Sequence, residues 1–297
     1  MKVVTAGKKY LDIDAFAGMI GYAELLRLRG VEAVVVSSAK PNESVTRRLR
    51  EFDEIERNYE PGVGDGFVVL DVSDPEHFDP MVDMERVEEV IDHHPGYEKY
   101  WTERIGNKAE IEPIGAVCTI IYEKWRDAGL LSEMRKSSAT LLAAGILDNT
   151  LNLGAKITTE RDKEALSSLS RIGELSEGYS AEYFSEIQGA VEADIPCSIR
   201  DDTKILFLEG LGREIRFGQL AVWDGERILP EVAKLGAEFD FMNFIDISGK
   251  RSVFVTYDRD IKEYFEKLLG VKFVDGIAEA GGLWLRKEIL RESLLKK

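Results

Sequence analysis

Short apolar runs rich in β-branched residues alternate with helix-like segments through the first half of the chain. The runs predict strands at residues 3–6, 31–37, 67–72 and 87–91. Near-continuous apolar runs are typical of strands that a parallel sheet buries on both faces. Apolar residues at helical spacing predict helices at 14–29, 43–52, 114–128 and 136–147. This alternation predicts an α/β fold built from right-handed βαβ units around a parallel sheet.

The pattern changes in the second half of the chain. Helical periodicity over residues 161–191 stops near Pro196, and longer alternating strands follow at 204–209, 214–223, 240–247 and 251–257, with helices expected at 226–235 and 260–269. A chain of 297 residues is also longer than most single domains. We therefore predict an N-terminal α/β domain over 1–190, a linker over 191–198 and a smaller C-terminal α/β domain with a mixed sheet over 199–297.

The formal net charge of −16 narrows the range of partners. It repels acidic lipid and nucleic acid over most of the surface, so we expect no membrane contact and no nucleic acid beyond short oligonucleotides. No stretch approaches the ~20 apolar residues that span a bilayer, and the N-terminus does not resemble a signal peptide. Two distant cysteines, Cys118 and Cys197, favour a reducing, cytoplasmic setting. A small anionic substrate stays compatible with this charge if cations gather in one cleft.

Acidic residues and histidines follow several of the apolar runs. In an open parallel sheet, ligands bind beyond the carboxyl ends of the strands, so side chains that follow different strands meet at one edge. Helix capping or a turn would explain a single aspartate, but not two of only three histidines directly after a buried strand. The third, His77, lies in a polar loop and is expected to be an ordinary surface residue. The candidates at this edge are Asp12, Asp14, Asp71, Asp92, His93, His94 and Asp148.

So many carboxylates in one place need a compensating charge. A divalent metal supplies it, and oxygen ligands with one or two imidazoles suit Mn²⁺ or Mg²⁺, with Zn²⁺ or Co²⁺ tolerated. A carboxylate shared between two such ions is the usual arrangement for attack of hydroxide on phosphorus. The sequence therefore predicts a divalent metal centre that acts on a phosphate compound.

These residues, in this order and at these separations, resemble the motifs of the DHH phosphoesterase superfamily. The stretches Asp148-Asn149-Thr150-Leu151-Asn152 and Thr158-Thr159-Glu160-Arg161-Asp162 are similar to the branch that contains manganese-dependent (family II) inorganic pyrophosphatases and exopolyphosphatases. In the C-terminal domain of that branch, an Arg-Lys pair and an upstream lysine bind substrate phosphates. Arg286-Lys287 and Lys204 match them here, and the resemblance spans almost the whole chain.

The resemblance implies a role for each matched residue and Mn²⁺ as the cofactor, with Co²⁺ or Mg²⁺ as alternatives. Asp12 would bind one metal and Asp14 the other, with Asp71 bridging them. His93 and Asp148 would complete the ligands of the second metal. His94 would face the substrate phosphate, and Asp92 would orient the histidines.

One position departs from the family pattern. Pyrophosphatases of this branch have a metal-binding histidine four residues before the first aspartate, where this chain has Lys8. An ammonium group cannot bind a metal, and its positive charge opposes a cation nearby. We expect Lys8 to neutralise Asp12 and to contact phosphate, which makes it a candidate catalytic residue beside Asp92 and His94. Exopolyphosphatase-like members also lack the histidine, so the departure does not imply inactivity.

The leading interpretation is a metal-dependent phosphohydrolase that cleaves a phosphoanhydride, such as pyrophosphate or a short polyphosphate, by metal-activated water in an interdomain cleft. A phosphodiesterase acting on short oligonucleotides or dinucleotides is one alternative, although the absence of any histidine after His94 argues against it. A catalytically weakened phosphate- or nucleotide-binding protein is the other. For Arg286 and Lys287, the competing interpretation is a solvated helix face. The assembly state stays open, with a homodimer as one option.

Overall fold

The computed structural model describes residues 1–236 and 238–295, and contacts within it divide the chain into two compact units. The N-terminal unit contains Met1–Leu153 and Ile157–Ser180, and the C-terminal unit contains Gly154–Lys156 and the chain from Ala181 onward. The expected boundary at residue 190 lies within helix α6 (Tyr179–Ala193). Most of the expected linker belongs to the end of α6 and to helix α7 (Ile195–Asp201). The predicted domain limits stay a prediction.

Five parallel strands form the sheet of the N-terminal unit, in the order β2-β1-β3-β4-β5. The parallel α/β prediction is confirmed, and all four expected strands lie within one or two residues of their expected bounds. The edge strand β5 was missed because its three residues are too few to give a periodic signal. The strands are β1 (Lys2–Thr5), β2 (Ala33–Val35), β3 (Gly66–Leu70), β4 (Val87–Asp92) and β5 (Ala109–Ile111).

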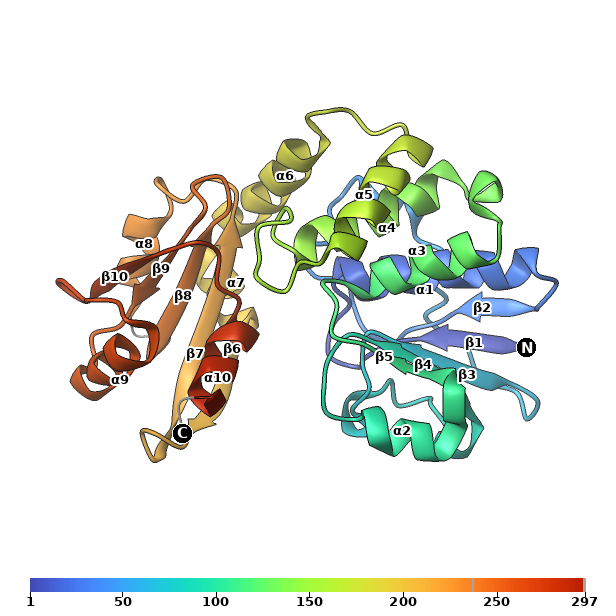
Figure 1. The fold of residues 1–297 in the computed structure, drawn as a ribbon, viewed down its shortest axis with the longest axis horizontal. Helices are drawn as coiled ribbons and strands as arrows, with labels where there is room; N and C mark the ends of the chain where they lie inside the picture. Colours follow the sequence, from blue (N-terminus) through green and yellow to red (C-terminus); the bar gives the residue numbers. More distant parts are fainter. Residues whose placement is uncertain (237, 296–297) are drawn as a thin grey trace. The chain divides into compact units, whose positions relative to one another are not determined.

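Helices cover both faces of this sheet (Figure 1). Trp101 of α2 packs with Val3 and Phe67 on one face. On the opposite face α1 comes close to the sheet, since a Cβ added at Gly18 would lie 3.8 Å from Leu70. The helices are α1 (Ile13–Leu28), α2 (Glu98–Ile105), α3 (Val117–Asp127), α4 (Lys136–Asn149) and α5 (Glu160–Ile172).

The prediction of a helix at 43–52 is wrong for most of these residues, because only Leu49–Phe52 form a short 3₁₀ turn. Polar side chains at its start make other hydrogen bonds. Asn42 Oδ1 accepts from the backbone N–H and the hydroxyl of Ser44, and Ser44 Oγ accepts from Ile13 N at 2.8 Å. Such local side-chain bonds compete with the helical pattern. They tie this segment to the first turn of α1 instead.

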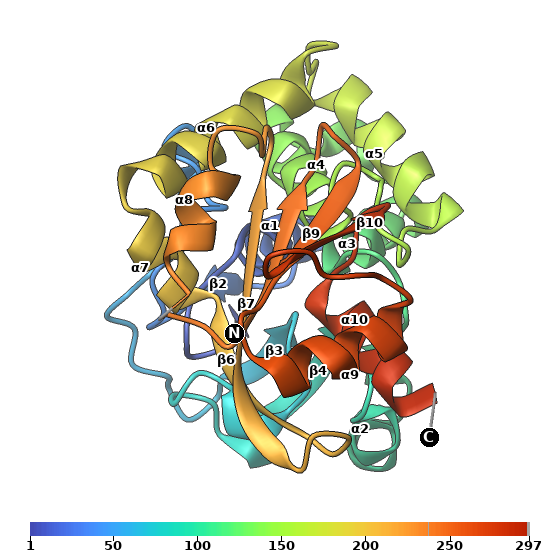
Figure 2. The same cartoon turned by 90° about the vertical axis from the view of Figure 1, so that its left-hand side faces the viewer.

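The C-terminal unit contains the predicted mixed sheet, in the order β10-β9-β8-β7-β6 (Figure 2). Strands β7 and β8 are parallel and the other neighbours are antiparallel. Strand β10 was missed because its sequence, IAEAG, carries little β-branched signal. The elements are β6 (Thr203–Leu208), β7 (Arg213–Val222), α8 (Leu229–Lys234), β8 (Phe241–Asp246), β9 (Arg251–Val255), α9 (Arg259–Leu269), β10 (Ile277–Gly281) and α10 (Arg286–Leu295).

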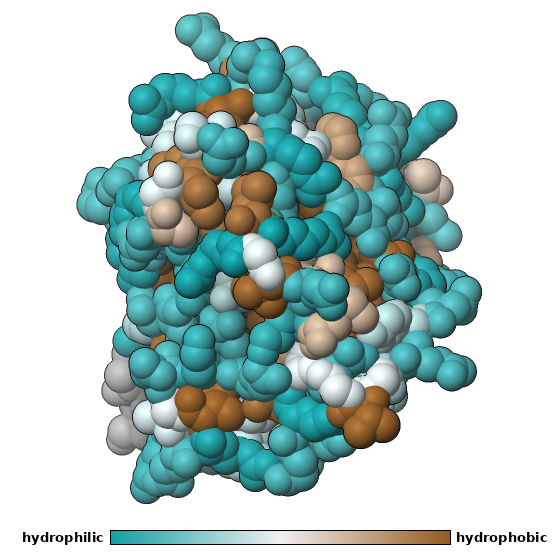
Figure 3. Space-filling view, turned by 90° about the vertical axis from the view of Figure 1, so that its right-hand side faces the viewer, coloured by the Kyte–Doolittle hydropathy of each residue, from teal (hydrophilic) through white to brown (hydrophobic). Residues whose placement is uncertain are grey.

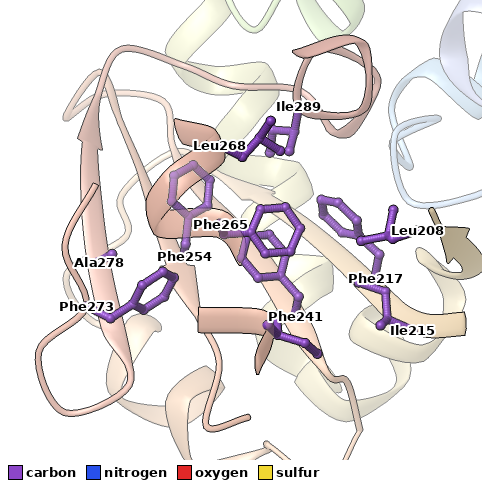
Figure 4. Close-up of a cluster of buried hydrophobic side chains, with 11 residues drawn as sticks. Leu208, Ile215, Phe217, Phe241, Phe254, Phe265, Leu268, Phe273, Ala278 and Ile289 are labelled. Carbon is purple, nitrogen blue, oxygen red and sulfur yellow. The ribbon is translucent and has the colours of Figure 1, made fainter. Parts of the chain in front are cut away.

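Aromatic rings fill the core between this sheet and helices α9 and α10 (Figure 4). Phe241 of β8 and Phe265 of α9 stack with their centroids 3.7 Å apart, and Phe217 of β7 meets both edge-on. Ile289 of α10 completes the same cluster. The C-terminal unit therefore has its own hydrophobic core.

One face of the molecule shows the polar character that the composition implies. Hydrophilic side chains cover most of the face in Figure 3, and apolar ones occur in small separate groups. Within the described residues, no helix combines the length and the apolar character that crossing a membrane requires.

Helices α1, α3 and α4 approach one another closely at Gly145. A Cβ atom added there would lie 2.5 Å from Cys118 Sγ and 3.1 Å from Asp14 Oδ1. Real Cβ atoms do not come so close to a neighbour without displacing it. The lack of a side chain at residue 145 therefore lets α4 reach the start of α1 and α3.

We expect Gly145→Ala to destabilise the protein by about 1–3 kcal/mol through overpacking, although alanine favours helices by ~1 kcal/mol. The matched control is Gly189→Ala in α6, where an added Cβ has no neighbour within 4 Å. That variant should gain up to ~1 kcal/mol from helix propensity alone. Denaturant unfolding of both variants measures the difference. A stabilised Gly145→Ala protein would contradict the close helix approach.

Candidate metal centre

Three neighbouring strands bring the predicted acidic and histidine residues to one edge of the N-terminal sheet. Asp14 lies in the first turn of α1, just beyond β1, while Asp71 follows β3 and His93 follows β4. Asp71 has a left-handed backbone conformation, with φ 59°, which aspartate tolerates better than most residues. Its N–H donates to the carbonyl of Ile91 at 2.9 Å, so the turn at Asp71 is fixed to β4.

The side chains meet at distances suited to one shared ion. His93 Nε2 lies 3.3 Å from Asp71 Oδ1 and 3.8 Å from Asp14 Oδ2. His94 Nδ1 lies 3.9 Å from Asp71 Oδ1. Among the described residues, the donor atoms of Asp71, His93 and His94 form a group in which all lie within 4.8 Å of one another. His93 and the neighbouring Asp14 are buried, whereas half of the His94 side chain is exposed.

The buried carboxylate of Asp14 accepts hydrogen bonds from two other helices. The N–H of Val117 donates to Oδ2 at 2.8 Å and that of Cys118 to Oδ1 at 2.9 Å, and Asn149 Nδ2 of α4 also donates to Oδ2. The two N–H groups are the first of α3, so the positive end of that helix faces the carboxylate. Burial nevertheless raises the pKa of Asp14 to about 6, because desolvation outweighs these bonds.

The two histidine rings are oriented by different groups. His93 Nδ1 lies 3.0 Å from the carbonyl oxygen of Ile114, which can only accept, so Nδ1 carries the proton. Nε2 therefore is the nitrogen that faces Asp71 and Asp14, and in the neutral ring its lone pair is available to a metal.

Asp92 organises the turn and the other ring. Its Oδ1 accepts from the N–H of His93 at 2.7 Å and of His94 at 3.1 Å, and lies 2.8 Å from His94 Nδ1. Burial opposes ionisation of Asp92, but the hydrogen bond and the charge of His94 hold its pKa below the usual range. The sequence identified Asp92 but could not reveal the main-chain carbonyl that holds the ring of His93.

The remaining N-terminal candidates lie in the segment between β1 and α1 and at the end of α4. Asp12 is the N-cap of α1, with Oδ1 accepting from Ala15 N at 3.0 Å. Asp148 is half-buried in the last turn of α4, next to Asn149. Lys8 is exposed after β1, and its N–H donates to the carbonyl of His77 at 2.9 Å.

His77 therefore lies beside the loop of Lys8. Its side chain is 68% exposed and its Nδ1 lies 3.3 Å from Asp74 Oδ2.

Comparisons with known proteins show what the chain is similar to. Residues 2–146 match the model of the DHH family, N-terminal domain. This stretch, just under half of the chain, therefore resembles a DHH domain. A Bacillus licheniformis relative named "Probable manganese-dependent inorganic pyrophosphatase" is 25% identical over 302 residues, covering 97% of this chain and 96% of that protein. A Streptococcus thermophilus protein of the same name is 29% identical over 182 residues. The alignment covers 58% of this chain and 55% of that protein. The predicted resemblance is confirmed.

Two solved structures share the fold. A crystal structure from Methanococcus jannaschii, assigned there to the family II inorganic pyrophosphatases, has a TM-score of 0.71 at 23% identity and covers 100% of this chain and 99% of that chain. An exopolyphosphatase-related protein from Bacteroides fragilis has a TM-score of 0.54 at 10% identity. The match covers 99% of this chain and 92% of that chain. At these identities the likeness shows the fold alone: a parallel α/β unit followed by a mixed-sheet unit.

The N-terminal unit also has a surface groove of about 850 Å³ that contains none of the predicted site residues. Two of its cations are paired with carboxylates of the groove. Lys124 Nζ lies 2.5 Å from Glu110 and 3.5 Å from Glu89, and Arg161 bonds both Glu112 and Glu123. These two cations therefore offer little attraction for an anion.

The expected phosphate-binding cations of the C-terminal unit differ in their surroundings. Arg286 is only 8% exposed, and its guanidinium donates to the carbonyl of Asp202 at 2.5 Å, to Asp202 Oδ1 at 2.6 Å and to the carbonyl of Phe217 at 3.1 Å. The solvated-helix interpretation is therefore wrong for Arg286. Lys204 is exposed on β6, and Lys287 is half-buried on α10. Whether these residues bind substrate stays a prediction.

Arg286→Ala should lower the free energy of unfolding by about 3–5 kcal/mol, because it leaves a half-buried carboxylate and two carbonyls without their donor. Arg291→Ala, on the exposed face of the same helix, should change it by less than ~0.5 kcal/mol. Urea unfolding measures both variants. Equal stability of the two would show that the Arg286 contacts contribute nothing to the fold.

Proposed function

We propose that this protein is a metal-dependent phosphohydrolase that cleaves a phosphoanhydride, with inorganic pyrophosphate as the leading substrate and Mn²⁺ as the leading metal. The observation that carries the proposal is the buried contact of His93 Nε2 with the carboxylates of Asp71 and Asp14. The names of relatives aligned over nearly their whole length support it, since both are named "Probable manganese-dependent inorganic pyrophosphatase".

The donor set fits a hard divalent cation. It offers carboxylate oxygens and imidazole nitrogen, whereas the nearby thiol of Cys118 is turned toward the carbonyl of Asp14 at 3.5 Å. Oxygen with imidazole suits Mn²⁺, Co²⁺ or Mg²⁺ better than a soft metal. Asp14, Asp71 and His93 would hold the ion, with Asp12 and Asp148 as further ligands. When bound, such an ion stabilises the negative charge that develops on phosphate oxygens during hydrolysis.

His94 is the side chain best placed to contact substrate. Half of its side chain is exposed, in contrast to the buried His93. With Nδ1 held by Asp92, its Nε2 can point toward a phosphate oxygen and donate a proton to it. The hydrogen bond to the Asp92 carboxylate fixes the ring in this orientation. His94 would thereby bind the phosphate and assist departure of the leaving group.

Cations of the C-terminal unit would bind the remaining phosphate charge. We assign this phosphate-binding role to Lys204 and Lys287, since the guanidinium of Arg286 is already hydrogen-bonded to Asp202. A lysine acts on phosphate as a compact point charge. Their replacement by alanine should therefore raise KM and leave metal affinity unchanged.

His93→Ala should lower kcat for pyrophosphate at least ~100-fold, because a buried ligand and its hydrogen bond to Ile114 are lost together. The control is His77→Ala, which removes an exposed imidazole and should keep kcat within about twofold of the original protein. Phosphate release is measured with Mn²⁺, Co²⁺ and Mg²⁺ on pyrophosphate, short polyphosphates and dinucleotides. Hydrolysis of dinucleotides without hydrolysis of any phosphoanhydride would overturn the proposal in favour of a phosphodiesterase.

Lys8→His introduces the residue type that the family resemblance implies at this position. Because a neutral imidazole can bind a cation that an ammonium repels, we expect more Mn²⁺ bound per chain and faster pyrophosphate hydrolysis. Elemental analysis after removal of free metal gives the stoichiometry. If both stoichiometry and kinetics stay as they are, residue 8 lies outside the site.

A further inference from the structure

One short main-chain stretch holds two of the side chains at the candidate metal centre. The carbonyl of Ile114 fixes the ring of His93 at 3.0 Å, and the N–H groups of Val117 and Cys118 hold both oxygens of Asp14. None of these contacts uses a side chain of the stretch. A shift of residues 114–118 would therefore move Asp14 and His93 relative to each other.

The carboxylate of Asp162 anchors that stretch. Asp162 is fully buried in the first turn of α5. Its Oδ2 accepts from the N–H of Gly115 at 3.2 Å, and its Oδ1 accepts from the hydroxyl of Thr119 at 2.6 Å. A Cβ at Gly115 would lie 2.7 Å from Asp162 Oδ2 and 2.7 Å from Thr150, at the end of α4. The stretch is thus clamped between α5 and α4.

Capping of α5 does not account for these contacts. Asp162 and Thr159 already form a complete capping box, in which Oδ2 accepts from the N–H and hydroxyl of Thr159 at 2.7 Å each. The bonds to Gly115 and Thr119 reach across to the start of α3, more than forty residues away in sequence. A charged side chain with no exposed surface is costly unless it is fully hydrogen-bonded, and here protein groups supply every one of those bonds.

We infer that Asp162 is a positioning residue for the candidate metal centre: it fixes residues 114–118, which in turn orient Asp14 and His93. The inference rests on the proposed function in one respect, namely that the ligand of this centre is a divalent metal. The contacts by which Asp162 fixes residues 114–118 are present in the metal-free protein and do not depend on it.

Asp162→Asn is the direct test. The amide keeps the shape of the carboxylate, but one of its two polar atoms becomes a donor and faces N–H or O–H groups that also donate. We expect weaker Mn²⁺ binding by roughly 10- to 100-fold, the usual effect of removing a group that supports a metal ligand. Calorimetric titration of the full chain with Mn²⁺ measures this without reference to activity.

Cys118 supplies a second readout in the metal-free protein. It is one of two cysteines in the chain and is completely buried at the start of α3, so it should react slowly with a thiol reagent. In a Cys197→Ser background it is the single reactive thiol. If Asp162 clamps this segment, Asp162→Asn should increase the labelling rate of Cys118 at least about tenfold, because the buried thiol reacts only when the segment opens.

Asp258→Asn is the matched control. Asp258 is the N-cap of α9 in the C-terminal unit, where its Oδ1 accepts from the N–H groups of Asp260 and Ile261. The same change of charge at a helix N-cap, where the amide oxygen of asparagine can still accept these bonds, should leave both Cys118 labelling and Mn²⁺ affinity unchanged.

A second pair keeps the test decisive if Asp162→Asn does not fold. Thr119→Val removes one donor to Asp162 with little change of shape, and Thr119→Ser retains the hydroxyl. The valine variant should show faster labelling of Cys118 and weaker Mn²⁺ binding, and the serine variant should restore both toward the original values.

The inference is overturned if folded Asp162→Asn, or Thr119→Val in its place, matches Asp258→Asn in both labelling and Mn²⁺ affinity. A different result bears on the proposed function alone. If the unaltered protein binds no Mn²⁺, the metal assignment fails, while Cys118 labelling still decides whether Asp162 holds the segment.

Discussion

The buried carboxylate of Asp14 is the interaction on which the N-terminal unit depends. It lies at the start of α1, receives the first N–H groups of α3 and is bonded by Asn149 at the end of α4. Three helices from distant parts of the chain therefore meet at one negative charge. Water cannot stabilise that charge, so the helix N-terminus and the amide do so instead; they offset only part of the desolvation, which raises the pKa of Asp14 to about 6. A centre of this kind is held ready for a cation rather than assembled by it.

The edge of the sheet where these groups lie could be predicted from the sequence, because it follows from the topology of a parallel sheet. Parallel strands end at the same side, so polar residues directly after apolar runs had to converge there. This reasoning identified Asp14, Asp71 and His93 correctly as neighbours. It predicted the sheet order of neither unit, and it misassigned the helix at 43–52, where Asn42 and Ser44 make local bonds that a hydrophobic pattern does not register.

The groups that orient the site were beyond the reach of sequence reasoning, because most are main-chain atoms. A carbonyl such as that of Ile114, or an N–H such as that of Val117, belongs to every residue type and leaves no trace in composition or spacing. The same holds for Gly145, whose importance lies in the side chain it lacks. Asp162 could have been suspected, since a capping-box aspartate preceded by two threonines is visible in the sequence, but its bonds to Gly115 and Thr119 needed the fold.

Charge balance connects the proposed metal centre to its one unusual residue. On the proposed mapping, Asp12, Asp14, Asp71 and Asp148 bring four negative charges to the end of the sheet, which two divalent ions would neutralise. One divalent ion and the ammonium of Lys8 together supply three positive charges, close to the same balance. A lysine in place of a histidine ligand would therefore weaken binding of the first ion. Its own positive charge would still compensate the carboxylates. Such a centre would favour substrates that bring their own cation, as pyrophosphate does when it is bound as its metal complex.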